Sequence, residues 1–215
     1  MNLKPKIDPN EPVRRSFGVE DLTASDEGDV IAGHPAVYGQ KTNIGGHFYE
    51  VIERGAFDKC DFDDVRFTAG HDLQRPVLAR SRRNNGNSTM QLSLDNVGIM
   101  IKAKLDTENN ADARGLYSAV KRGDVDGMSF IFYIRGEEWD DLDTDMPTRR
   151  ITDISKVIEV SAVNFPAYPQ TDVSARDQRT LDNAREALEN ARSQWLDNRK
   201  ALELEKLRTQ ILMKG

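Results

Sequence analysis

The chain has 215 residues, which is enough for one full domain with an appendage or for two small domains. It carries 30 Lys and Arg residues against 36 Asp and Glu residues, a net charge of −6. This acidic balance argues against nucleic-acid binding, which depends on basic side chains that neutralise phosphates.

Cysteine and histidine are scarce, which limits the kinds of site that the chain can build. With one cysteine, Cys60, no internal disulfide can form, and the three histidines show no spacing typical of metal ligands. The longest apolar run, 130–134, is far shorter than the roughly 20 residues of a membrane-spanning helix. Residues 1–6 lack the apolar core of a signal peptide. We therefore expect a protein of a reducing, cytoplasm-like compartment, with no membrane partner, metal or other cofactor.

In chain order, a proline-rich arm precedes a region of short strands. Residues 1–12 mix prolines with both charges, which predicts a flexible N-terminal arm. Residues 13–176 form the predicted domain, in which apolar or alternating segments are separated by turn residues. The expected strands lie at 30–33, 36–39, 64–69, 99–105, 128–134 and 157–163. Short strands at this spacing favour a mostly β domain, an antiparallel barrel or a sandwich.

One helix interrupts these strands. Asn109 or Asn110 is the expected N-cap, and Gly123 is the expected C-terminal stop. The predicted buried stripe consists of Leu116, Ala119 and Val120.

Two polar segments are predicted to be loops. Residues 81–88 contain Asn85-Gly86, a turn signal that predicts the tip of a β-hairpin. Residues 137–145 hold six acidic side chains in nine positions. We interpret this second segment as a solvated loop or hairpin tip rather than as a site that attracts a basic substrate.

The composition changes for the last part of the chain, 177–215. No Pro occurs there, Ala, Leu, Glu and Arg dominate, and apolar residues recur at 3-4 spacing from Leu181 to Trp195. A helix of about 35 residues would extend roughly 50 Å. Such a helix either folds back onto the domain or forms a partner-binding arm, and its thin, Ala-rich stripe favours the arm. Asn198 interrupts the stripe with a polar group, which is typical of a register-setting position in a coiled coil.

The histidines are the natural starting point in a search for catalytic groups, because imidazole accepts protons near neutral pH. His71 follows the strand at 64–69 and precedes Asp72, so that a strand end would hold it rigidly. His34 lies in a turn before Pro35, and His47 follows two glycines in a loop. His71 is therefore the preferred candidate for a general base, although a loop histidine with a purely structural role has the same local signature.

Ser129 and Glu159 are the other candidates. Strand alternation places Ser129 on the face opposite Met128 and Phe130, beside Gly127, where there is room for a substrate. Alternation likewise places Glu159 away from its apolar neighbours, and a carboxylate there needs either solvent or a partner such as a histidine. No short motif of the Gly-x-Ser-x-Gly type is present, so no single signal is specific.

Several short blocks, taken together and in order, carry a resemblance. They are Gly33-x-x-Ala36-Val37-Tyr38-Gly39, Glu50-x-Ile52-x-x-Gly55-Ala56-Phe57, His71-Asp72, Gly127-x-Ser129-Phe130-x-Phe132, and Glu159-Val160-Ser161-x-Val163-x-x-Pro166-Ala167-Tyr168-Pro169-x-Thr171. Over about residues 13–176 the chain resembles the prohead serine proteases of tailed bacteriophages, which are capsid-maturation proteases.

The resemblance implies a fold similar to the herpesvirus assemblin proteases, a mostly β barrel with peripheral helices. It also implies a serine endopeptidase inside the prohead, in the host cytoplasm, that cleaves scaffolding segments of the major capsid protein or a scaffold protein, and usually itself. The family's histidine and serine carry over to His71 and Ser129. Glu159 matches the acidic residue of the last block and is the expected orienting group, with Asp72 and Asp153 as alternatives.

Two departures from the family pattern support a competing hypothesis. Gly70 stands where the family often has Asn, and Ile131 stands where it often has a small residue. The alternative is a catalytically weak or inactive protein of the same fold that assists capsid assembly through its helical tail. In either case we expect the tail to self-associate or to pair with a scaffold helix.

Overall fold

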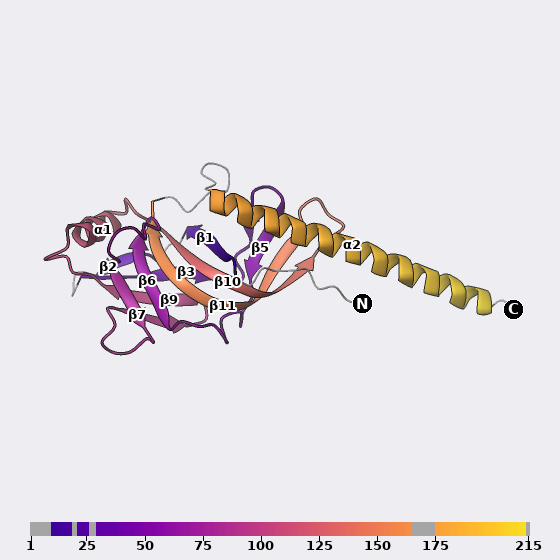
Figure 1. Ribbon diagram of the computed structural model, residues 1–215, viewed down its shortest axis with the longest axis horizontal. Coiled ribbons are helices and arrows are strands. Elements are labelled where there is room, and N and C mark those ends of the chain that lie inside the picture. Colours follow the sequence, from indigo (N-terminus) through magenta and orange to yellow (C-terminus); the bar gives the residue numbers. More distant parts are fainter. Residues whose placement is uncertain (1–9, 19–20, 26–28, 165–174, 214–215) are drawn as a thin grey trace.

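The computed structural model describes residues 10–18, 21–25, 29–164 and 175–213. Two β-sheets form the body of the protein, and a long C-terminal helix extends from one end of it (Figure 1). Most of the predicted N-terminal arm lies outside the described residues, but a strand already begins at Pro12. The predicted block 166–171 also lies outside them.

The larger sheet has seven strands. Its main path runs β1 (Pro12–Gly18), β10 (Gly127–Asp140), β11 (Thr148–Val163), β5 (Phe48–Ile52) and β4 (Thr42–Ile44), and β6 (Asp64–Ala69) pairs with both β11 and β7 (Ala79–Arg82). The first part of β11 lies parallel to β5 and its last part lies parallel to β6. Bulges in the β10–β11 ladder increase the local twist of these two long strands.

The smaller sheet has four strands and faces the larger one across the main core. Its order is β2 (Thr23–Ser25), β3 (Val30–Val37), β9 (Gly98–Lys104) and β8 (Met90–Leu94). Ile99 and Ile101 of β9 and Phe130 and Phe132 of β10 are fully buried in one cluster. This packing confirms the predicted inward face of residues 128–134.

The ladders of the described residues remain two open sheets. The mostly β class and the long C-terminal helix are therefore confirmed, whereas the predicted closure into a barrel is not.

The internal helix is α1 (Ala111–Arg122), and both predicted caps are confirmed. The Asn110 side chain accepts hydrogen bonds from the backbone N–H groups of Asp112 and Ala113. Gly123 ends the helix with φ of 76°, a conformation that glycine adopts without a steric penalty.

The hairpin predicted at residues 81–88 is wrong. β7 pairs with β6 in the larger sheet, whereas β8 pairs with β9 in the smaller one, so this segment crosses between sheets. The Asn84 side chain exchanges two hydrogen bonds with the backbone of Leu92 and fixes the crossing. The turn residues correctly indicated that the chain changes direction here, but they do not determine which strands pair.

The acidic segment 137–145 is the end of a real hairpin between β10 and β11. Its first member, Glu137, is not solvated, because its side chain is 1% exposed and pairs with Arg149. The prediction of a solvated tip therefore fails for Glu137, whereas Asp141 and Asp143 are exposed.

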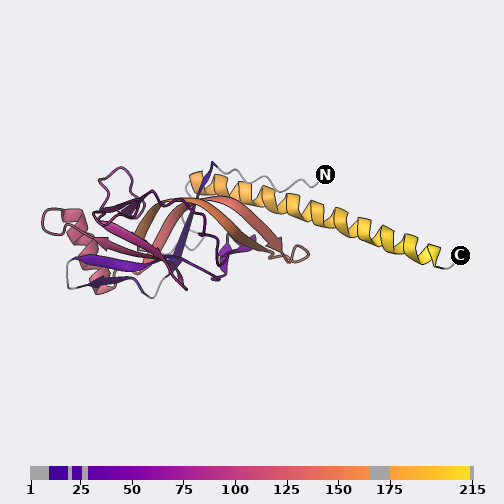
Figure 2. The same ribbon diagram turned by 90° about the horizontal axis from the view of Figure 1, so that it is seen from below.

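The second helix, α2 (Ala175–Leu212), behaves differently along its length. Near its start, Leu181, Ala184 and Leu188 pack on Ile44 and Phe48 of the β4–β5 hairpin. Beyond Trp195 the side chains are exposed, and Figures 1 and 2 show this distal half (196–212) projecting away from the sheets. The first part of the helix thus folds back onto the domain, as one of the two alternatives proposed, and its distal half extends away from the domain. No helix in the described ranges combines the length and apolarity needed to cross a membrane.

Candidate active site

Three strands of the larger sheet bring the three predicted site residues together. Ser129 lies on β10, Glu159 lies on the neighbouring β11, and His71 follows the end of β6. In the ladders Ser129 is opposite Ser161, and Ser161 is opposite Thr68. Strand pairing therefore places chemistry-bearing residues from distant parts of the chain side by side.

His71 connects the other two residues. Its Nε2 lies 2.6 Å from Ser129 Oγ, and its Nδ1 lies 2.7 Å from Glu159 Oε2. With the proton on Nδ1, the ring donates to the carboxylate and leaves Nε2 to accept the serine proton. This is the geometry required of a nucleophile, a base and an orienting group.

The backbone at His71 is unusual. His71 has φ of 62° and follows Gly70, whose φ is 61°. For a residue with a Cβ, the left-handed conformation costs about 1–2 kcal/mol, so the surrounding structure has to impose it. Gly70 N–H donates to Ala162 O at 2.9 Å, and His71 N–H donates to Ser161 Oγ at 3.0 Å. Gly70, which departs from the family pattern, thus supports the turn that presents His71.

Glu159 is a buried carboxylate with 1% of its surface exposed. Within the described ranges no Lys or Arg pairs with it. Oε1 instead accepts a hydrogen bond from the Thr68 hydroxyl, and Oε2 faces His71. Strand alternation left solvent or a partner such as a histidine as alternatives for Glu159, and in the structure its carboxylate meets a hydroxyl and an imidazole.

Ser129 is fully buried, so the open space expected beside it is absent. β1 lies along β10, where Ser16 is opposite Ser129 and its hydroxyl donates to Ser129 Oγ at 2.9 Å. The Ser129 hydroxyl also has a second acceptor, Arg15 O, at 2.9 Å. The single proton of Ser129 is therefore shared between a productive acceptor, His71, and a competing one.

The two alternative orienting residues lie elsewhere. Asp72 is half exposed and pairs with Arg75, with 3.3 Å between Oδ2 and Nε. Asp153 binds Arg135 through two hydrogen bonds of 2.7 and 2.8 Å. Each carboxylate is thus committed to an arginine.

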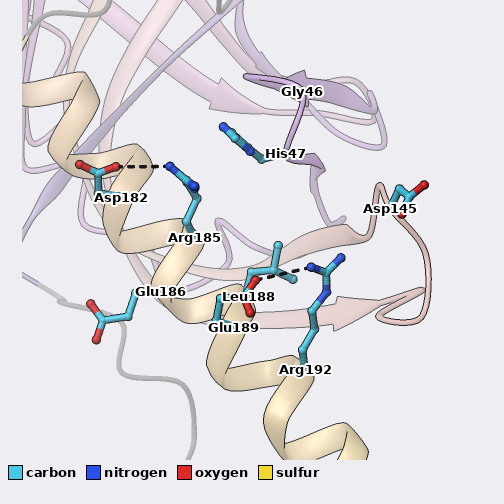
Figure 3. A pocket seen from close by; sticks show the side chains of 9 residues that line it. All are labelled: Gly46, His47, Asp145, Asp182, Arg185, Glu186, Leu188, Glu189 and Arg192. Atoms are coloured by element: carbon cyan, nitrogen blue, oxygen red, sulfur yellow. Dashed lines mark hydrogen bonds and ion pairs between the residues drawn. The ribbon is translucent and has the colours of Figure 1, made fainter.

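The two remaining histidines also have other surroundings. His34 lies between Asp21 and Asp95, with both ring nitrogens facing a carboxylate. His47 lines a pocket between α2 and the β10–β11 hairpin, together with side chains such as Asp182, Arg185 and Glu189 (Figure 3). No residue of the His71 site lines this pocket.

Neither a thiol nor a metal offers an obvious alternative chemistry. Burial raises the pKa of Cys60 to about 12, so its thiol is protonated at neutral pH and a poor nucleophile. In the part of the chain that the structure describes, no group of three His, Cys, Asp or Glu side chains is arranged to hold a metal ion.

Sequence reasoning missed three hydroxyl groups around the site: Ser16, Thr68 and Ser161. Ser161 is two residues after Glu159, so strand alternation alone would have placed it on the same face. Thr68 and Ser16 carry no comparable signal, because their roles depend on which strands pair.

A comparison with protein-family models bears on this arrangement. The model of the caudovirus prohead serine proteases matches residues 16–186. The chain belongs to this family. No curated protein and no solved structure matched the chain.

The family consists of serine peptidases, so membership supports protease activity at the level of the family. The matched range includes β6, β10 and β11, and it also includes the first turns of α2. The matched range ends at residue 186, within the part of α2 that packs on the β4–β5 hairpin.

Proposed function

We propose that the chain is an active serine endopeptidase of phage prohead maturation, with Ser129 as nucleophile, His71 as general base and Glu159 as orienting group. The observation that carries the proposal is that one imidazole bridges Ser129 Oγ and Glu159 Oε2 at 2.6 and 2.7 Å. The alternative, an inactive protein of the same fold that assists capsid assembly, would not require these two contacts.

The mechanism follows from the donors and acceptors. Ser129 Oγ attacks a peptide carbonyl while His71 Nε2 takes the hydroxyl proton, and the new imidazolium then gives that proton to the leaving amine. Glu159 holds the proton on Nδ1 and stabilises the imidazolium. While Ser129 Oγ loses its proton, the Ser16 hydroxyl, 2.9 Å away, donates a hydrogen bond to the negative charge that develops on that oxygen. Water then repeats the same proton transfers to release the acyl group.

The buried position of Ser129 adds a requirement. A substrate reaches the hydroxyl only after local contacts move, and Arg15 O must give up its share of the Ser129 proton. This is appropriate for an enzyme that has to remain restrained until assembly.

The substrates that we propose are the major capsid protein or a scaffold protein within the prohead, together with the chain itself. An assemblin-like arrangement of the strands is part of the same proposal. The distal half of α2 supplies an exposed helical surface for self-association or for pairing with a scaffold helix, with Leu202, Leu204, Leu207 and Ile211 all exposed.

The direct test is co-expression with the proposed substrate, the major capsid protein of the phage or prophage that encodes this chain. We expect the wild type to convert the capsid protein to a shorter form, and Ser129→Ala and His71→Ala to leave it at full length. Ser81→Ala is the matched control, because Ser81 is also fully buried but its hydroxyl has no hydrogen-bond partner in the described structure. Normal processing by Ser129→Ala would overturn the proposal.

A second experiment concerns the tail. Among the described residues, deleting 198–215 removes exposed side chains only, and it retains the packing of Leu181, Ala184 and Leu188. We expect this variant to fold and to keep a reactive Ser129, but to enter proheads less efficiently than the full chain. Equal packaging of both forms would show that the distal half of α2 is not the docking element.

A further inference from the structure

We propose that Thr68 and Ser161 are positioning residues of the catalytic site: their hydroxyls close a ring of hydrogen bonds that fixes both the backbone and the imidazole of His71. The inference rests on the proposed function. Neither hydroxyl touches the nucleophile, so both act through Glu159 and His71.

The ring begins at the buried carboxylate. Glu159 is 1% exposed, and each of its oxygens meets one donor: Oε2 meets His71 Nδ1, and Oε1 meets the Thr68 hydroxyl. A buried anion that loses one of its donors bears the full desolvation cost of that oxygen. Without the Thr68 hydroxyl, the carboxylate would have to rotate or admit water, and Oε2 would leave its place under the imidazole.

The directions of the hydrogen bonds follow from the chemistry of the groups. An ionised carboxylate only accepts, so the one proton of Thr68 is directed at Glu159. Thr68 Oγ1 is then free to accept from Ser161 Oγ, which lies 3.1 Å away, and the Ser161 proton has Thr68 O as a second acceptor at the same distance. Ser161 Oγ in turn accepts the backbone N–H of His71 at 3.0 Å.

The ring therefore starts and ends on the same residue. It runs from the His71 backbone N–H through Ser161, Thr68 and Glu159 to His71 Nδ1. Both arms of the ring donate toward the Glu159 carboxylate: one runs from the His71 backbone N–H through Ser161 and Thr68 to Oε1, and the other runs from His71 Nδ1 to Oε2. The donors of each arm polarise one another toward this negative charge. Because His71 has φ of 62°, its backbone needs an external anchor, and Ser161 supplies one from β11. Nε2 can point at Ser129 only when both ends of His71 are held.

The register of two strands builds this arrangement. Ser161 on β11 and Thr68 on β6 are direct partners in a parallel ladder, and both are buried. Small hydroxyl side chains at a paired position bridge the strands and leave space for the His71 ring above them. Both side chains are polar and buried, so each needs hydrogen-bond partners, and the other groups of the ring supply them.

The test uses diisopropyl fluorophosphate, a reagent that labels reactive serines and needs no knowledge of the natural substrate. We expect Thr68→Val to label Ser129 about tenfold to a hundredfold more slowly than the wild type, the range for losing a hydrogen bond to a charged group. We expect Thr68→Ser, which keeps the hydroxyl, to recover to within about threefold. Ser161→Ala should be slowed about tenfold through the loss of the His71 anchor.

Thr148→Val is the matched control. It makes the same chemical change at a buried threonine of β11 whose hydroxyl has no hydrogen-bond partner in the described structure. We expect its labelling rate to equal that of the wild type. Thermal unfolding of every variant separates a lost fold from a misplaced histidine.

A second readout does not depend on activity. The proton shared by His71 Nδ1 and Glu159 should give a far-downfield NMR resonance, assigned by its disappearance in His71→Ala. We expect this resonance to shift or vanish in Thr68→Val and to persist in Thr68→Ser and Thr148→Val.

The outcomes are distinct. Wild-type labelling or an unchanged resonance in Thr68→Val would overturn the inference, and so would a Thr68→Ser variant as slow as Thr68→Val. If the folded wild type is not labelled at Ser129, the resonance alone decides the role of Thr68, and the proposed function fails if that protein also leaves the co-expressed capsid protein at full length. If Thr68→Val does not fold, Ser161→Ala takes its place, and normal labelling of that variant overturns the ring.

Discussion

Two buried glutamates of the larger sheet, Glu50 on β5 and Glu159 on β11, show how the same side chain serves two purposes. Both have at most 3% of their surface exposed. Glu50 lies between two guanidinium groups, with contacts of 2.5 and 3.0 Å to Arg15 and 3.1 Å to Arg149. Glu159 has no such cation within the described residues, and it meets a hydroxyl and an imidazole instead.

The difference lies in when the compensating charge is present. Arginine does not release its proton in proteins, so the charge of Glu50 is balanced at all times. Burial raises the pKa of Glu50, but Arg15 and Arg149 outweigh this effect and hold it below its usual value. In the proposed mechanism, the partner of Glu159 becomes cationic when His71 takes the proton of Ser129. An interaction that strengthens in the transition state accelerates the reaction, whereas one that is equally strong throughout only stabilises the protein.

The comparison of the two glutamates predicts that a substitution at Glu159 has the largest effect, a loss of Ser129 reactivity. Glu159→Gln replaces one acceptor oxygen with an amide donor, so either Thr68 or His71 then faces a second donor. We expect the imidazole to lose its productive orientation, and labelling of Ser129 to fall by about 10⁴-fold, the loss seen when a triad carboxylate is replaced by its amide. The rate of labelling by diisopropyl fluorophosphate measures this.

The controls are the carboxylates that the sequence offered as alternatives. Asp72→Asn and Asp153→Asn remove charges paired with Arg75 and Arg135 on the surface, and both should label at the wild-type rate. A normal rate in Glu159→Gln together with a large loss in Asp72→Asn would reassign the orienting role.

Glu50→Gln should have the opposite profile, a loss of stability with little loss of reactivity. The substitution leaves the buried Arg149 and the adjoining Arg15 with one charge fewer to balance them. Breaking a buried pair from one side costs about 3 kcal/mol or more. We expect the free energy of unfolding in urea to fall by about that amount, while labelling of Ser129 stays within about tenfold. A stable but unreactive Glu50→Gln protein would contradict the distinction between the two glutamates.

The pH dependence of stability sharpens the same contrast. A folded pKa below the ordinary 4.5 means that the stabilisation by Glu50 is fully present above about pH 5 and is lost as the pH falls through the folded value. The stability difference between the wild type and Glu50→Gln should therefore shrink below pH 4.5. Urea unfolding of both proteins from pH 3 to 7 tests this, and a difference that grows on acidification would mean that the arginines do not stabilise the ionised form.

Much of this molecule could be predicted from local sequence signals. The alternation at 128–134 gave the inward face of β10, and Asn110 and Gly123 gave the ends of α1, because each signal depends on neighbours in the chain. The resemblance gave His71, Ser129 and Glu159 as a group, and the structure places these three residues in contact.

What could not be predicted depends on which strands pair. Asn85-Gly86 indicated a turn but not that β7 and β8 belong to different sheets. The roles of Thr68 and Ser16 follow from the ladders β6–β11 and β1–β10, which join residues about 90 and 110 positions apart. Glu137 belongs to an acidic run that we predicted to be solvated. Its side chain is instead buried against Arg149, which lies across the hairpin and is not a neighbour in the sequence.

The comparison also applies to two histidines that face carboxylates, and it predicts the smallest effect, a change in stability, at His34. His71 faces one carboxylate and one hydroxyl, whereas His34 faces Asp21 with Nδ1 and Asp95 with Nε2, 3.0 Å away. Both nitrogens of His34 can donate only when the ring is protonated. Partial burial lowers the pKa of His34, but the two carboxylates outweigh it and raise the pKa above 6.5. Protonation of His34 thus places a cation between two anions, an arrangement comparable to that of the arginines around Glu50.

The stabilisation by His34 depends on pH in the opposite sense to the stabilisation by Glu50. A raised folded pKa means that the stabilisation by His34 is complete below about pH 6.5 and is lost as the pH rises through the folded value. Asp21 and Asp95 are more than 40% exposed, so solvent screening limits the contribution to about 1 kcal/mol or less, equivalent to about 2–4 °C in a chain of this size. We expect the wild-type unfolding temperature, measured relative to that of His34→Gln, to fall by this amount between pH 6 and pH 8.5. Labelling of Ser129 should be the same in both proteins, because His34 has no contact with the triad. A gap between the two unfolding temperatures that stays constant or widens with pH would show that His34 is held as a neutral ring, and its resemblance to the arginines around Glu50 would then be one of position only.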